Sequence, residues 1–194
     1  ALEGIPYPSI EYRIRKKTDE YIWLDTATEP ILNDEGKVIA LQTTSREISD
    51  RKRIDILFQQ SQKMANVGGW EYNLTSGRLY WTDEVYRIHE LPIGVPVKVE
   101  DGLSYYPEGG SRETLQAAIN HTILTGERYD LELPFVTAKG NDIWVRAIGH
   151  AELIDGKAVK MIGAFQNITR IKEQEEKIKS QVKQLSQLKS TREK

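Results

Sequence analysis

The sequence predicts an α+β fold: an antiparallel β-sheet with small helices on one face, followed by an amphipathic helix at the carboxyl end. Three observations support this prediction. Apolar and polar residues alternate between Tyr129 and Ile168, turn residues divide that stretch into three strands, and the apolar period lengthens to between three and four after Ile168. A shorter copy of the same arrangement opens the chain, so we expect a partial second unit made of a three-stranded meander.

The opening copy aligns with the later one by pattern, with Trp23 matching Trp144 and Ile48 matching Ile168. Each copy runs strand, strand, strand, helix. A three-stranded meander with an uncovered apolar face is only marginally stable, so the first copy needs a cover. That cover is another part of the same domain, a neighbouring segment or a partner chain. The side chains that need it are Tyr12, Ile14, Ile22, Leu24, Ile39 and Leu41.

A connecting helix is expected over residues 47–67, because its apolar residues recur at the spacing of one helix face. Gly68 and Gly69 should end this helix. Alternation then predicts strands over 70–74 and 78–81, joined by a turn. The apolar residues of the helix are Ile54, Leu57 and Met64.

Small helices are expected between these strands and the final meander. Thr82 is a candidate cap for a short helix that ends near His89. Three prolines make residues 91–107 irregular, and residues 111–124 form a longer helix that stops before Gly126. The predicted domains are residues 1–50, 67–169 and two helical linkers over 51–66 and 170–194.

Composition limits the function classes. The 194 residues carry 27 basic and 29 acidic side chains, which indicates no nucleic-acid surface. No stretch reaches the roughly 18 consecutive apolar residues of a membrane span, and the start lacks the order of a signal peptide, so we expect a cytoplasmic protein without membrane segments. Cysteine is absent, which excludes disulfides and thiolate chemistry.

Four short motifs occur in order between residues 65 and 172, and together they resemble a PAS sensor domain. They are Gly-Gly-Trp-Glu-Tyr at 68–72, Trp-Thr-Asp-Glu-Val-Tyr at 81–86, Tyr-Asp-Leu-Glu-Leu at 129–133 and Trp-Val-Arg at 144–146. The first 52 residues resemble only the carboxy-terminal (PAC) half of such a domain. The resemblance implies a sensory segment of a bacterial-type multidomain signalling protein, most often a histidine kinase and next a cyclic-di-nucleotide enzyme, and this segment itself is not expected to be an enzyme.

The resemblance leaves the cofactor open. Flavin photosensors of this family need a cysteine for the photoadduct, and this chain has none. Haem sensors use an axial histidine, and His121 lies on the predicted long helix, but no haem motif accompanies it. His89 and His150 are scattered, so no metal site is predicted.

Aromatic and aliphatic residues form a candidate ligand pocket, for which the alternative is a filled core. Its members are Trp70, Tyr72, Trp81, Tyr86, Ile119, Leu133 and Phe135. Trp144 belongs to the same aromatic group. Arg146 is expected to pair with Glu132 on the neighbouring strand, or else to meet an anionic ligand.

The end of the last strand is the expected signal junction. PAS proteins commonly have Asp-Ile-Thr here, and the equivalents are Glu47-Ile48-Ser49 and Asn167-Ile168-Thr169. Asn167 cannot form the usual ion pair, so coupling through the second copy is expected to differ.

The terminal helix is expected to pair in a coiled coil of two identical chains, or to lie back on its own domain as a single helix. The apolar residues that predict pairing are Ile171, Ile178, Val182 and Leu185. Two functions remain open at this point: a sensor of a small molecule or partner that signals through this helix, and a ligand-free dimerisation spacer.

Overall fold

The computed structural model describes residues 9–192. The chain forms two compact units, which divide between residues 58 and 59 within one helix. We call residues up to 58 unit 1 and the remainder unit 2. The ends of the predicted first domain and of the output helix, residues 1–8 and 193–194, lie outside the described residues.

Unit 1 contains the predicted three-stranded meander. Its strands are β1 (Ile10–Arg15), β2 (Tyr21–Leu32) and β3 (Val38–Glu47), antiparallel in the order β1-β2-β3, and β3 leads into α1 (Ser49–Ala65). Ile22 and Ile48 are buried, whereas Ile39 and Leu41 are 63% and 67% exposed. Within the described part of unit 1, most of the apolar sheet surface is therefore uncovered.

Unit 2 contains one five-stranded antiparallel sheet in the order β5-β4-β8-β7-β6. The strands are β4 (Val67–Asn73), β5 (Arg78–Trp81), β6 (Tyr129–Val136), β7 (Asp142–Ile154) and β8 (Lys157–Asn167), and the helices are α2 (Asp83–His89), α3 (Val99–Ser104), α4 (Ser111–Thr125) and α5 (Thr169–Arg192). Because β4 pairs with β8, residues near 70 lie beside residues near 163. This arrangement confirms the predicted α+β class.

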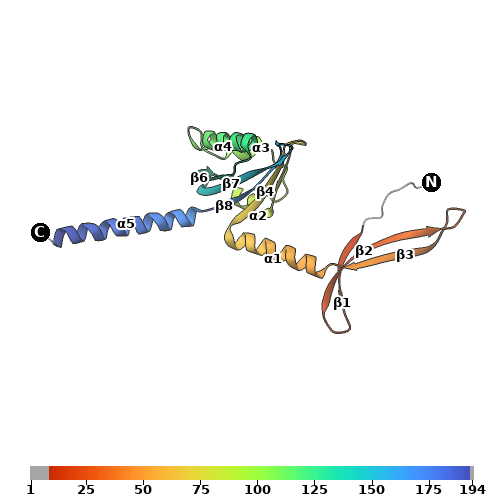
Figure 1. Ribbon diagram of the computed structural model, residues 1–194. Helices are drawn as coiled ribbons and strands as arrows, with labels where there is room; N and C mark the ends of the chain where they lie inside the picture. Colours follow the sequence, from red (N-terminus) through yellow and green to blue (C-terminus); the bar gives the residue numbers. More distant parts are fainter. Residues whose placement is uncertain (1–8, 193–194) are drawn as a thin grey trace. The chain divides into compact units, whose positions relative to one another are not determined.

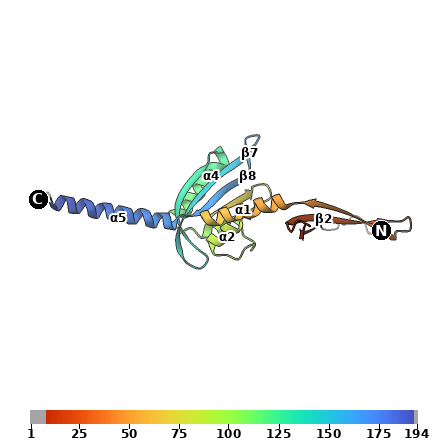
Figure 2. The ribbon, with the colours of Figure 1, turned by 90° about the horizontal axis from the view of Figure 1, so that it is seen from below.

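Helices α2 and α4 cover one face of the sheet. α2 lies against β4 and β8, and α4 lies against β6, β7 and β8 (Figures 1 and 2). The core between them includes Val85 of α2, Leu115 of α4 and Met161 of β8, all at most 4% exposed. The opposite face carries ion pairs such as Lys160 with Glu152 at 3.2 Å. The alternation of apolar and polar residues in each strand therefore separates core from solvent.

The two copies share strand register. Leu24 pairs with Glu47 in unit 1, and Val145 pairs with Asn167 in unit 2. Each second strand has an irregularity, after Ile31 in β2 and after Glu152 in β7. The hairpins differ because β2 and β3 are joined by residues 33–37, whereas β7 and β8 are joined by Asp155 and Gly156, both with positive φ. Counted between the equivalent pairs, Leu32 with Val38 and Leu153 with Ala158, the turn is residues 33–37 in unit 1 and 154–157 in unit 2, which is the one-residue difference between the copies.

Gly68 and Gly69 do not end the connecting helix, which corrects that prediction. α1 ends at Ala65, followed by Asn66 with φ of 50°, and both glycines lie inside β4. A Cβ on Gly68 would lie 2.4 Å from Val85 Cγ2. Gly68 therefore allows α2 to approach the sheet, which is a tertiary role that local sequence does not reveal.

Thr82 occupies the predicted N-cap position of α2, although its hydroxyl makes no cap bond and instead accepts a hydrogen bond from the Gly69 amide at 3.0 Å. Residues 91–107, predicted irregular, contain α3. The side chain of Asp101 accepts a bond from the Lys98 amide at 3.0 Å, so the first turn of α3 is capped from within the helix.

Candidate sensory cavity and signal junction

A cavity of about 120 Å³ lies in unit 2 between the sheet and its covering helices. Aromatic, aliphatic and glycine residues from α2, α3, α4 and all five strands form most of its wall. They include Tyr72, Leu79, Trp81, Val85, Leu103, Tyr106, Leu115, Ile119, Tyr129, Ala147, Met161 and Phe165. Among the described residues that line it, none is acidic or basic, and His89 contributes the one imidazole.

Four of the seven predicted pocket residues line this cavity, namely Trp70, Tyr72, Trp81 and Ile119. The remaining three are packed in the core and do not line it. Tyr86 is buried and its hydroxyl donates to the Val95 carbonyl at 3.2 Å, while Leu133 and Phe135 are 8% and 1% exposed. A packed core therefore surrounds a small cavity.

His89 was not among the predicted pocket residues. Its ring is 3% exposed and lies between aromatic rings, with centroids 4.3 Å from Trp81 and 4.9 Å from Phe165. The signal that could have found it is its place on α2, because Val85, Ile88 and His89 fall on one apolar helix face.

The hydrogen bonding of His89 defines its tautomer. Nδ1 lies 2.8 Å from the Val85 carbonyl oxygen, which can only accept, so Nδ1 carries the proton. Burial lowers the pKa of His89 to about 4, against the opposing effect of the Val85 bond. The ring is therefore neutral at pH 7, and Nε2 carries a lone pair.

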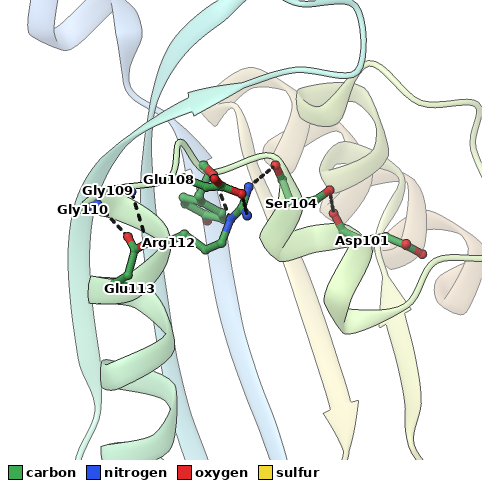
Figure 3. Close-up of polar contacts among 8 residues, drawn as sticks. Asp101, Ser104, Glu108, Gly109, Gly110, Arg112 and Glu113 are labelled. Atoms are coloured by element: carbon green, nitrogen blue, oxygen red, sulfur yellow. Dashed lines mark hydrogen bonds and ion pairs between the residues drawn. The ribbon is translucent and has the colours of Figure 1, made fainter.

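The wall formed by α3 and the loop after it is attached to α4 through Arg112 (Figure 3). Its guanidinium donates to the Ser104 carbonyl at 3.0 Å, the Tyr106 carbonyl at 3.2 Å and the Glu108 carboxylate at 2.7 Å. Glu113 accepts bonds from the loop amides of residues 109 and 110 at the start of α4. Because Tyr106 lines the cavity, these contacts hold one of its walls in place.

The junction between β8 and α5 is a set of connected hydrogen bonds. The Thr169 hydroxyl accepts from the Trp144 amide at 3.0 Å and donates to Asn167 Oδ1 at 2.7 Å. The Ile168 amide donates to the Trp144 carbonyl at 2.9 Å, and Ile168 is 3% exposed. Lys172 in the first turn of α5 pairs with Glu132 of β6 and lies over the Trp144 ring at 5.4 Å.

The same set occurs in unit 1. The Ser49 hydroxyl accepts from the Trp23 amide at 3.0 Å and donates to Glu47 at 3.1 Å, and the Ile48 amide donates to the Trp23 carbonyl. Lys52 pairs with Glu11, as Lys172 pairs with Glu132. Asn167 thus accepts the same hydroxyl bond as Glu47, so this bond does not require a charged side chain.

Arg146 does not pair with Glu132, although the two are opposite each other in the register. Its guanidinium makes two bonds of 2.6 Å to the Asp130 carboxylate, the diagonal neighbour. The bidentate bond lowers the pKa of Asp130. Glu132 pairs with Lys172 instead. The expected Arg146–Glu132 pair is therefore replaced by two other ion pairs.

The other histidines lie away from the cavity. His121 is exposed and its Nε2 lies 3.0 Å from Glu127, and His150 is exposed as well. Trp144 is 39% exposed and lies at the junction. Among residues 9–192, no group of three or more His, Cys, Asp or Glu side chains is arranged to hold a metal ion.

The apolar stripe of α5 is exposed within this chain. Ile171, Ile178, Val182 and Leu185 have exposed fractions of 47%, 60%, 60% and 61%. This argues against the alternative in which the helix lies back on its own domain. In the described part of the chain, no helix is both long and apolar enough to span a membrane.

Comparison with known proteins gives a family for the opening residues and a set of relatives. Residues 1–45 match the family model described as PAS fold. The chain is 24% identical over 178 residues to the blue-light-activated histidine kinases of Brucella ovis and Brucella melitensis, and the alignment covers 82% of this chain and 36% of each relative. The chain therefore spans about a third of the length of these curated relatives.

Two solved structures are similar to this chain. A sensory box histidine kinase/response regulator from Burkholderia thailandensis has a TM-score of 0.48 and 24% identity, covering 67% of this chain and 98% of that one. The N-terminal domain of a diguanylate cyclase with PAS/PAC sensor from Marinobacter aquaeolei has a TM-score of 0.49 and 18% identity, covering 53% and 95%.

The family model and the sequence relatives confirm the predicted resemblance to PAS sensor domains, including those of histidine kinases. The model matches the first copy, and the shared register and junction bonds show the same pattern in the second. The match to the PAS fold model is thus to residues 1–45, and unit 2 repeats the register and junction bonds of that stretch.

Proposed function

We propose that this chain is a sensory input segment of a signalling protein, in which unit 2 binds a small molecule and α5 transmits the change. The course of β8 is the observation that supports this most directly. Met161 and Phe165 of β8 line the cavity, and the same strand continues to Ile168 at the start of α5. A displacement of Phe165 has only three residues to cross before it reaches the junction bonds of Thr169.

In this proposal each part of the chain has a separate role. Residues 1–50 are the carboxy-terminal half of a PAS domain, residues 51–66 are a signalling helix, residues 67–169 are a complete PAS domain, and residues 170–194 begin an output linker. The names of the relatives support a histidine kinase as the output domain, with a cyclic-di-nucleotide enzyme as the alternative.

The input we propose is chemical. The relatives are named as activated by blue light, but a cysteinyl flavin adduct requires a thiol that these 194 residues do not contain. A bound molecule shifts α5 only if it binds the two junction states with different affinity. Cavity and junction share β8, which is the element through which such a difference acts.

A second candidate function is pairing of two chains without a ligand. The exposed stripe on α5 supports it, because four apolar side chains at heptad-like spacing gain burial only against a partner. In that case the module sets the distance between other domains, and the cavity is incidental.

Native mass spectrometry of the purified chain, followed by amide hydrogen exchange, tests the proposal. A bound mass per protomer, and faster or slower exchange in residues 161–175 after its removal, are expected. A bound mass whose removal leaves that exchange unchanged overturns transmission through β8. An empty dimer supports pairing alone, and an empty monomer overturns both candidates.

A further inference from the structure

We infer that the cavity selects small, uncharged aromatic molecules that donate one hydrogen bond, and that His89 Nε2 is the acceptor of that bond. This inference rests on the proposed function of unit 2 as a ligand sensor. It concerns the chemistry of the ligand, which neither the fold nor the relatives specify.

The lining excludes ions. None of the residues that form the wall is acidic or basic, so a charged ligand would lose its hydration without a counter-charge. Burial also raises the pKa of the lining residues Tyr106 and Tyr129, which shows that this region disfavours a negative charge. A neutral ligand has no such cost.

The size and shape of the wall favour an aromatic ring. The cavity of about 120 Å³ is close to the roughly 150 Å³ apolar cavities that accept benzene. Indole rings of Trp70 and Trp81 and the phenyl ring of Phe165 contribute flat surfaces to it. Offset and edge contacts between such rings and an aromatic ligand add to the burial of its area.

His89 supplies a polar atom without a partner. In the part of the chain that the structure describes, no hydrogen bond uses Nε2, yet Nε2 is not among the fully enclosed atoms that lack a partner, which are Asp25 Oδ1 and Thr122 Oγ1. His89 is 3% exposed and lines the cavity, so the cavity is where we place a partner for Nε2.

The tautomer makes the site selective for donors. Nδ1–H is bound to the Val85 carbonyl, so Nε2 of the neutral ring can only accept. The hydroxyls of Tyr106 and Tyr129 can donate or accept and do not discriminate. A ligand with an O–H or N–H group thus satisfies Nε2, whereas one with only an acceptor places two lone pairs against each other.

Four probes of similar size test this with the full 194-residue chain: phenol as donor, toluene without a polar group, pyridine as acceptor only, and benzoate as anion. Binding is followed by tryptophan fluorescence, because Trp70 and Trp81 line the cavity, and by calorimetry at pH 7.5. We expect phenol to bind about two- to tenfold more tightly than toluene, the range for one neutral hydrogen bond. Pyridine should bind more weakly than phenol, and benzoate should not bind.

The variant His89→Phe keeps an aromatic ring in the stack and removes the acceptor, so the preference for phenol over toluene should disappear while toluene still binds. His121→Phe, at an exposed site, is the matched control and should keep the preference. If His89→Phe does not fold, nitrogen NMR of the unaltered chain replaces it. Phenol should then move the Nε2 resonance of His89 and toluene should not.

The role of His89 is overturned if phenol and toluene bind equally, or if the preference for phenol remains in His89→Phe. The proposed function of unit 2 as a ligand sensor is not affected by either result. Preferred binding of benzoate overturns the neutral ligand class. Binding of phenol without any change in amide exchange at 161–175 upholds the ligand class and overturns the proposed transmission. If no probe binds, the inference is overturned, and native mass spectrometry then decides separately whether the chain holds another molecule.

Discussion

At the scale of single residues, the buried imidazole of His89 makes the stability of unit 2 depend on pH. Its pKa in the folded chain is about 4, compared with the ordinary 6.5. Between these values the unfolded chain binds a proton that the folded chain does not, so stability falls as the pH falls from 6.5 to 4. Above pH 6.5 this contribution is constant.

We therefore predict that the free energy of unfolding of unit 2 falls by at most about 3 kcal/mol between pH 7 and pH 4 because of this residue. This value corresponds to the difference of roughly 2.5 between the ordinary pKa of His89 and its pKa in the folded chain. His89→Phe should flatten this part of the profile. Urea unfolding at several pH values measures the effect. The carboxylates with lowered pKa, such as Asp130 and Glu113, lose their contribution at lower pH, below about 4.5. If His89→Phe has the same slope of stability against pH between 6.5 and 4.5 as the unaltered chain, this pH dependence does not come from His89.

A second residue-scale prediction concerns the close approach of α2 to β4. Gly68→Ala places a methyl group 2.4 Å from Val85 Cγ2 and 2.6 Å from the Val85 amide nitrogen, so α2 must move. We expect a loss of about 1–3 kcal/mol or more in the free energy of unfolding. Gly69→Ala is the control, because the nearest atom to its Cβ is 3.5 Å away, and it should cost much less. Thermal or urea unfolding compares the stability of the two variants. If both lose the same free energy of unfolding, the contact with Val85 is not the cause.

At the scale of elements, the strand-to-helix junction is the part that occurs twice. In both copies a hydroxyl bridges a tryptophan amide and a polar side chain two residues earlier, and a lysine one turn later pairs with a glutamate of the first strand. The repeated unit is therefore a strand end joined to a helix start. This joint fixes the direction in which α1 and α5 leave their sheets.

Thr169→Val should loosen the base of α5, because it removes the acceptor of the Trp144 amide and the donor to Asn167 while keeping the side-chain shape. We expect a cost of about 1–3 kcal/mol and faster amide exchange in residues 167–173. Thr169→Ser retains the hydroxyl and should behave as the unaltered chain. Unchanged exchange in Thr169→Val would show that the hydroxyl does not hold the junction.

The exposed stripe of α5 gives the second element-scale prediction. Ile178→Glu places a charge in the proposed helix seam and should weaken dimerisation by about tenfold or more while unit 2 stays folded. Ser180→Glu adds the same charge two residues away, off the stripe, and is the control. Sedimentation over a concentration series measures both. If Ile178→Glu and the unaltered chain have the same oligomeric state, the paired-helix proposal fails.

At the scale of the whole molecule, the two units differ in how much apolar surface they cover. Unit 2 has a core shared by two helices and five strands, whereas unit 1 has a three-stranded sheet with exposed Ile39 and Leu41. An isolated meander of this kind is only marginally stable. The two units should therefore not unfold together.

We predict two unfolding transitions, with the amides of β1–β3 exchanging faster than those of β7 and β8. Hydrogen exchange with residue-level resolution separates them, and limited proteolysis should leave a fragment that begins within α1. A single cooperative transition for both units would mean that the apolar surface of unit 1 is covered in solution, for example by a second chain.

The sequence by itself determined the strands, their turns and the repeat, because these follow from local alternation and from turn residues such as Asp155 and Gly156. It also placed four residues of the cavity and both junction motifs. Patterns of this kind depend on contacts between residues near in sequence, so they can be predicted without the tertiary structure.

Only the tertiary structure decided which side chains leave space and which fill it. Phe135 and Trp70 are both apolar residues of strands, yet Phe135 is enclosed by other rings and Trp70 borders the cavity. The same holds for Gly68, whose role depends on Val85 of a helix, and for His89, whose neutral state depends on burial between Trp81 and Phe165. These properties arise from packing between elements distant in sequence, and no local pattern contains them.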